Sequence, residues 1–183
     1  MKNMKKVVTA IFVAVLVLEP AIANAHVGVQ TRGNTLVAGQ SSRIYLSLGH
    51  GCTYKDLKYG TSVFQVVVPA SAGKPTPEYH YGFKTSVVAS KTFLADGVTP
   101  TQYSVTWTAT TRSHAIDDGT FYDFGIKVKW DKTPQKIAFP TTQICYAGKV
   151  PLYLKWEITD NSTKAATIDT EYGPAPTVTT VVA

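Results

Sequence analysis

Sulfur-containing and charged side chains are scarce in this 183-residue sequence. It has two cysteines and two methionines, and charged residues make up 16% of it. No block of Lys or Arg interrupts the chain, so the formal net charge of +6 does not indicate a nucleic-acid-binding protein. Aromatic residues make up 11%, and with so little charge this composition excludes an intrinsically disordered chain. The length suits one domain, or two small ones.

The sequence also lacks the motifs of several large enzyme classes. It has no G-x-S-x-G nucleophile elbow, no glycine-rich phosphate loop and no H-E-x-x-H motif. His50 lies two residues before Cys52, a spacing that permits Cys–His catalysis on an extended chain. We instead expect Cys52 to lie in a disulfide, which removes the nucleophile. The sequence therefore predicts a protein that is not an enzyme.

Long hydrophobic runs are missing except near the N-terminus. A segment with three lysines precedes the apolar run Val7–Leu18, and Ala23-Asn24-Ala25 follows it. The run is too short to span a bilayer, which needs about 20 residues. The small residues after it fit the cleavage site of a secretory signal peptide. We predict a signal peptide at residues 1–25, cleaved between Ala25 and His26, and a periplasmic or secreted protein without a membrane anchor.

Cleavage at this point changes the composition in a way that bears on metal binding. It leaves 158 residues with a formal charge of +4, because three lysines and Glu19 leave with the signal peptide. Met1 and Met4 leave as well, so the mature chain has no thioether. Cys52 and Cys145 are the only thiols, and in an oxidising compartment we expect a disulfide. It would close a loop of about 90 residues, worth ~4–5 kcal/mol in the chain-entropy model. A pair of thiolate metal ligands is the alternative, but no C-x-x-C spacing favours it.

Alternating apolar and polar residues predict β-strands throughout the mature chain. Ile44, Leu46 and Leu48 alternate with other residues, and turn formers such as Asp117-Asp118-Gly119 separate the runs. We interpret the two aspartates as a β-turn and not as a calcium site. No segment shows a helical period over ten or more residues. We therefore predict an all-β fold, a two-sheet antiparallel β-sandwich over residues 26–160. The predicted strands are 27–31, 42–48, 62–68, 84–89, 103–109, 121–130 and 150–158, and residues 161–183 are predicted to form an extended, polar, Pro-rich tail.

His26 becomes the first residue if the signal peptide is cleaved as predicted. Its α-amine and its ring Nδ1 can then close a six-membered chelate ring on one metal ion. An α-amine has a pKa of about 8, so a competing cation displaces its proton readily. Nitrogen donors favour copper(II). Copper(I) and blue-copper centres need the free thiolate or thioether ligands that the mature chain lacks. The alternative is that cleavage leaves a histidine there by chance.

Other side chains are candidate metal ligands, and for each of them a packing or surface role is the alternative. His50 lies between two glycines after a strand, and both metal ligation and a packing role fit this position. His80 lies in an aromatic-rich loop and His114 in a polar turn, so we expect both at the surface. Trp156 either packs in the core or lies over a metal site, with Glu157 as a candidate carboxylate ligand.

Several short motifs follow one another along the mature chain. They are Ala25-His26-Val27, Gly49-His50-Gly51-Cys52, Val105-Thr106-Trp107-Thr108, Asp117 to Gly125, Phe139 to Cys145, Trp156-Glu157 and Pro174-Ala175-Pro176. In this order, and over nearly the whole mature chain, they resemble the YcnI-like family of exported bacterial proteins. The resemblance implies a cupredoxin-like β-sandwich that binds copper(II) outside the cytoplasm. It also implies a copper transporter or copper chaperone at the membrane as the partner.

The resemblance implies a ligand set as well. The family uses the mature N-terminal histidine through amine and ring, a carboxylate, and a tryptophan close to the metal. His26 matches the histidine, and Trp156 is our choice for the tryptophan. The carboxylate does not transfer, because the family's Pro-Glu-Gly after the third strand is replaced here by Pro69-Ala70-Ser71. The remaining candidates for this ligand are Glu157, Asp56, Glu78 and, in place of a carboxylate, His50.

These observations predict a periplasmic copper(II)-binding protein that buffers or delivers copper without catalysis. Two alternatives remain open. A copper oxidase of the lytic polysaccharide monooxygenase type also begins with a histidine on a β-sandwich, but it would need His50, His80 or His114 as a second histidine. A metal-free extracytoplasmic interaction module would need none of these side chains.

Overall fold

A computed structural model describes residues 26–183, and the predicted signal peptide lies outside the described residues. Within residues 26–183 the helical segments are the short 3-10 turns η1 (Ala70–Ala72) and η2 (Arg112–His114), and no helix there is long and apolar enough to cross a membrane. The strands are β1 (Gly28–Gln30), β2 (Ser41–Leu48), β3 (Cys52–Tyr54), β4 (Leu57–Tyr59), β5 (Thr61–Pro69), β6 (Thr76–Pro77), β7 (Phe83–Ala89), β8 (Gln102–Ala109), β9 (Tyr122–Lys129), β10 (Lys136–Ala138), β11 (Thr141–Ala147), β12 (Val150–Ile158), β13 (Thr170–Pro174) and β14 (Thr177–Thr179).

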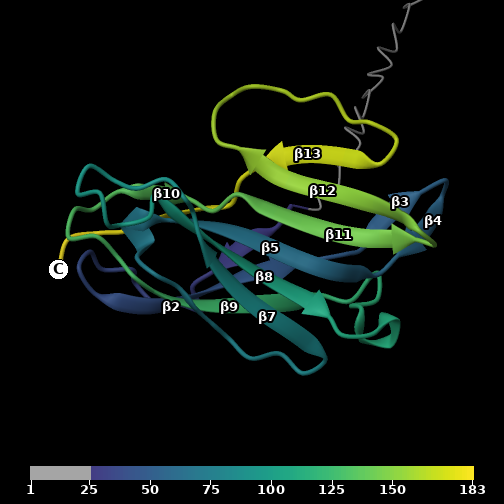
Figure 1. Cartoon of the computed structure of the whole chain (residues 1–183), viewed down its shortest axis with the longest axis horizontal. Coiled ribbons are helices and arrows are strands. Elements are labelled where there is room, and N and C mark those ends of the chain that lie inside the picture. The colour runs from purple at the N-terminus through teal and green to yellow at the C-terminus, as the bar shows by residue number, and fades with distance from the viewer. Residues whose placement is uncertain (1–25) are drawn as a thin grey trace, which may run out of the picture.

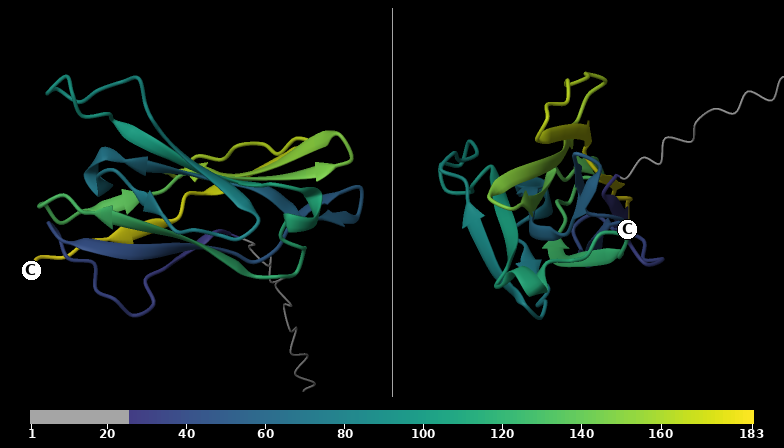
Figure 2. Two further views of the ribbon diagram at one scale, coloured as in Figure 1. Left: turned by 60° about the horizontal axis from the view of Figure 1, so that its bottom comes forward. Right: turned by 90° about the vertical axis from the view of Figure 1, so that its right-hand side faces the viewer.

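Two sheets pack face to face, as Figure 1 and the turned views of Figure 2 show. The four-stranded sheet has the order β1-β2-β9-β6, and the six-stranded sheet has the order β13-β12-β11-β5-β8-β7. Two small ribbons, β3–β4 and β10–β14, complete the molecule. Neighbouring strands are antiparallel except β12 and β13, which run parallel. The predicted two-sheet sandwich is confirmed, with one parallel pair at its edge that the sequence did not predict.

The alternation of side chains explains which face of each sheet is buried. In β9, Phe124 and Val128 are at most 2% exposed, while Lys127 between them faces solvent. Three fully buried rings come from both sheets, since Phe64 lies on β5, Trp107 on β8 and Phe124 on β9. Phe64 stacks on Phe124 with ring centroids 4.5 Å apart. Because each large apolar side chain contributes about 1.5–3 kcal/mol when buried, these contacts hold the two sheets together.

The C-terminal segment differs from the extended tail predicted for residues 161–183. Residues 161–169 form a loop without strands, but β13 joins the six-stranded sheet and β14 pairs with β10. Val178 is 7% exposed and Thr180 is 2% exposed, so this part of the segment is buried, while residues 181–183 are exposed. A strand as short as β14 is too short to show periodicity, which is why the sequence pattern missed it.

Strand β11 was also missing from the predicted set, for a different reason. Its inward side chains are Thr141, Gln143 and Cys145, all at most 1% exposed. The Gln143 amide donates to the Thr61 hydroxyl at 2.6 Å and to the His50 carbonyl at 2.8 Å. A buried polar side chain is tolerated when it is hydrogen-bonded in this way. Apolar periodicity fails to find a strand whose inward face is polar.

Candidate metal centre

His26 and Trp156 meet at Gly173. In the sheet, Gly173 of β13 lies opposite Trp156 of β12. A Cβ atom added to Gly173 would lie 2.9 Å from Cδ1 of Trp156 and 3.2 Å from Cδ2 of His26. Glycine is therefore required here, because the two rings occupy the space that a side chain would need. The structure brings together the two residues that the sequence assigned to a copper site.

The residue after His26 fixes its position. Val27 is 3% exposed and belongs to the main core cluster, and β1 begins at the next residue. His26 itself is exposed, and the Cδ2 edge of its ring faces Gly173. Cδ2 and Nδ1 flank Cγ on the two sides of an imidazole ring, so the ring edge nearest Gly173 is not the one that carries Nδ1.

Trp156 and Glu157 have different surroundings although they are neighbours on β12. Trp156 is 5% exposed and belongs to the core cluster. The pairing with β13 shifts between Trp156 and Ile158, which leaves Glu157 without a partner residue in β13. Glu157 instead accepts a hydrogen bond from Nζ of Lys164 at 2.6 Å in an ion pair.

The other carboxylates suggested by the sequence lie elsewhere on the fold. Asp56 is at the tip of the β3–β4 hairpin, where its φ of 62° belongs to a tight turn. The carboxylate of Glu78 lies against Gly125 of β9. Within residues 26–183, no three His, Cys, Asp or Glu side chains gather into a group that could hold a metal ion.

His50 lies beside the disulfide. The predicted bond between Cys52 and Cys145 is confirmed, and it joins β3 to β11 with Cα atoms 6.0 Å apart. Nδ1 of His50 contacts the carbonyl oxygen of Gly51, and the His50 carbonyl accepts the bond from Gln143. Nε2 of His50 is buried without a hydrogen-bond partner among the described residues. The contacts of His50 thus belong to the packing around the disulfide.

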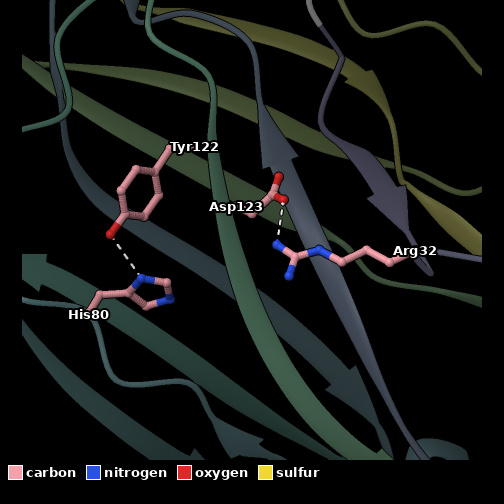
Figure 3. A network of polar contacts seen from close by, with 4 residues as sticks. All are labelled: Arg32, His80, Tyr122 and Asp123. Carbon is pink, nitrogen blue, oxygen red and sulfur yellow. Dashed lines mark hydrogen bonds and ion pairs between the residues drawn. The ribbon is translucent and has the colours of Figure 1, made fainter.

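His80 is half-buried and does not lie free at the surface. Its Nδ1 is 2.8 Å from the Tyr122 hydroxyl. Burial lowers the pKa of His80, and the nearby Glu78 carboxylate acts in the opposite direction. Figure 3 shows this pair on one side of β9, with the ion pair between Arg32 and Asp123 (3.0 Å) on the other. These contacts hold the segment before β7 against the aromatic core.

The remaining residues that the sequence singled out lie in turns. His114 is part of η2, and its Nδ1 is 2.8 Å from the Thr110 hydroxyl. Oδ1 of Asp118 accepts a hydrogen bond from the Gly51 backbone at 2.9 Å. Gly173 is the residue of the His26–Trp156 contact that sequence patterns missed. A glycine inside a strand is a signal of close approach, but the segment around Gly173 was not predicted to be a strand.

The fold and its disulfide define an immunoglobulin-like β-sandwich. A solved structure of an uncharacterized protein from Nocardia farcinica, described as an immunoglobulin-like fold, is similar, with a TM-score of 0.60, 19% sequence identity, and coverage of 85% of this chain and 98% of that chain. The chain belongs to the DUF1775 family, a domain of unknown function whose model matches residues 26–180. The YcnI-like family goes by this same domain name, so the resemblance in the sequence agrees with the match. A search of curated proteins finds no match.

Proposed function

We propose that the mature protein binds copper(II) through the α-amine and ring Nδ1 of His26 and handles copper outside the cytoplasm. The packing of the His26 ring on Gly173 beside Trp156 is the observation that carries this proposal. It places an exposed imidazole against the sheet through its Cδ2 edge. A disulfide-bonded fold is compatible with an extracytoplasmic location.

The donor set suits copper(II). An amine and an imidazole are nitrogen ligands, and among the divalent first-row metals copper(II) binds such ligands most tightly. Because Val27 is buried, the backbone at His26 is ordered before a metal arrives, which reduces the entropic cost of binding. The indole of Trp156 is an apolar wall on one side of the site and limits water access from that side.

The exposure of His26 favours a role in transfer. A ligand group on an incoming protein can reach a metal held by an exposed residue and replace its ligands one at a time. The protein would accordingly buffer copper(II) and exchange it with a copper transporter or copper chaperone at the membrane. The proposal assigns no catalytic step to any side chain.

The test is a copper(II) titration of protein that begins at His26, followed by electron paramagnetic resonance and tryptophan fluorescence. The matched control is the same protein acetylated at the α-amine of His26, which removes that nitrogen as a ligand without adding another amine. We expect one-to-one binding that weakens in the control by more than the roughly 10–100-fold typical of changes to outer-shell partners. Equal affinity of the two proteins would contradict the proposal.

Two substitutions separate the alternatives in the same titration. His50→Ala and Glu157→Gln should each leave copper affinity unchanged, because the contacts of these residues lie in the disulfide packing and with Lys164. A large loss in either variant would add that side chain to the ligand set. Oxidation of polysaccharide driven by hydrogen peroxide, with copper-loaded protein, would favour the monooxygenase alternative.

A further inference from the structure

Strand β7 is the outer edge of the six-stranded sheet. It pairs with β8 along its whole length, from Phe83 opposite Ala109 to Ala89 opposite Tyr103. It is last in the strand order, and no second strand pairs with it among the described residues (Figure 1). Every second residue of an edge strand points its backbone N–H and C=O away from the sheet. These groups form a row that another strand can pair with.

The sequence of β7 lacks the devices that usually protect such an edge. Natural edges carry proline, bulges or several charges that prevent pairing with another chain. The seven residues Phe83–Ala89 contain no proline or glycine, and their register with β8 has no shift. Lys84 is the one charged residue in the strand, and Val88 is 61% exposed. The edge is therefore regular, mostly uncharged and open to solvent.

We propose that β7 pairs antiparallel with β7 of a second copy of this chain, about a twofold axis at Ser86. The two six-stranded sheets then form one continuous sheet. In this register Lys84 lies opposite Val88 of the other copy, and Thr85 lies opposite Val87. The lysines do not meet, so the pairing avoids the like-charge contact that destabilises directly opposite residues. A contact of this kind is self-complementary, as a twofold dimer requires.

The proposed contact is independent of the metal site. Strand order places β7 and β13 at opposite edges of the six-stranded sheet. His26 and Trp156 lie at the β13 edge, where Gly173 separates their rings. The dimer therefore leaves both copies of the site open, and it should form equally with and without copper.

Cross-linking tests the register of the pairing. The native cysteines are joined to one another, and no free cysteine is present in residues 26–183. Ser86→Cys therefore adds one exposed thiol, which the twofold axis places beside its own copy at about 4.5–5.5 Å between Cβ atoms. We expect a covalent dimer on mild oxidation. The matched control is Ser104→Cys, on the same sheet face but on β8, one strand away from the edge.

Sedimentation tests the affinity. Ser86→Lys places two like charges at the axis and should weaken dimerisation at least tenfold, whereas Ser104→Lys, with the same change of charge, should not. Both positions lie outside the core, so circular dichroism should show that both variants fold. The proposal is overturned if the wild-type protein sediments as a monomer at every concentration. It is also overturned if the two cysteine variants cross-link equally, or if a different protein pairs with β7 while the chain itself stays monomeric.

Discussion

The two edge strands of the six-stranded sheet, β13 and β7, differ in their sequence and in the side chains that pack against them. At the β13 edge, the strand contains Gly173 and ends at Pro174, and the rings of Trp156 and His26 pack over the glycine. At the β7 edge, seven residues without proline or glycine run to the end of the sheet. At one edge distant side chains pack over the last strand, and at the other the last strand is a regular, unbroken run.

This difference separates two kinds of interaction within one sheet. The β13 edge presents a single fixed side chain, His26, and suits a small ligand. The β7 edge presents a row of backbone groups and suits another strand. The contact of His26 with Gly173 joins residues that are distant in sequence, at positions 26 and 173. An open edge requires nothing beyond its own sequence.

The largest effect on this comparison is expected from replacing Cys52 and Cys145 by alanine. The disulfide holds β3 against β11, in the half of the sheet that includes β13. Its loss should lower the free energy of unfolding by about 2–5 kcal/mol, measured by urea denaturation. Amide hydrogen exchange should rise more in β11, β12 and β13 than in β7 and β8. An equal rise in both halves would show that the disulfide stabilises them alike.

A smaller effect is expected from Gly173→Ala. The new Cβ would press on Trp156 and His26, and such overpacking costs about 1–3 kcal/mol of unfolding free energy. The same variant should bind copper(II) more weakly, because the His26 ring is displaced. Gly28→Ala is the matched control on β1, since no atom lies within 4 Å of its added Cβ. The packing argument fails if the two variants have equal stability and equal copper affinity.

The smallest effect is expected from the pH dependence of the segment that leads into β7. The His80 carbonyl accepts a hydrogen bond from the Phe83 backbone, and burial lowers the pKa of His80 below 6.5. As the pH falls, the His80 side chain of the unfolded chain therefore takes up a proton before that of the folded chain does. Proton uptake then favours the unfolded state, so the free energy of unfolding decreases as the pH falls below 6.5.

His80→Gln removes this titration while the other histidines stay in place. Between about pH 7.5 and about pH 5.5, the urea midpoint of the wild-type protein should fall further than that of the variant. Parallel curves for the two proteins would show that His80 has the same pKa in the folded and unfolded chains.

The sequence predicted the parts of this molecule that depend on local patterns. Strands β2, β5, β8, β9 and β12 were found because their inward residues are apolar at a period of two. The disulfide followed from a cysteine count in a chain predicted to be exported. Strand β11 was missed because its inward side chain Gln143 is polar and is stabilised by the hydrogen bonds that it donates to distant residues. Strand β14 was missed because it is too short to show a period.

The candidate site was predictable only in part. His26 and Trp156 were selected from the cleavage position and a family resemblance, without a reason for their contact. The contact depends on Gly173, whose place opposite Trp156 is set by the parallel pairing of β12 and β13. The ion pair of Glu157 with Lys164 was not predictable, because Lys164 lies in a loop of irregular structure.

The burial of Val27 gives the predicted cleavage site a fixed position relative to the folded core. Val27 is 3% exposed, so the sandwich fixes which residue lies just outside it, whatever the signal peptidase has done. A cut one residue early would leave the His26 ring in place and move the free amine to Ala25. A cut one residue late would remove the ring altogether. Molecules cut at these positions would share the sandwich fold and differ in the nitrogen ligands that the N-terminus offers to a metal ion.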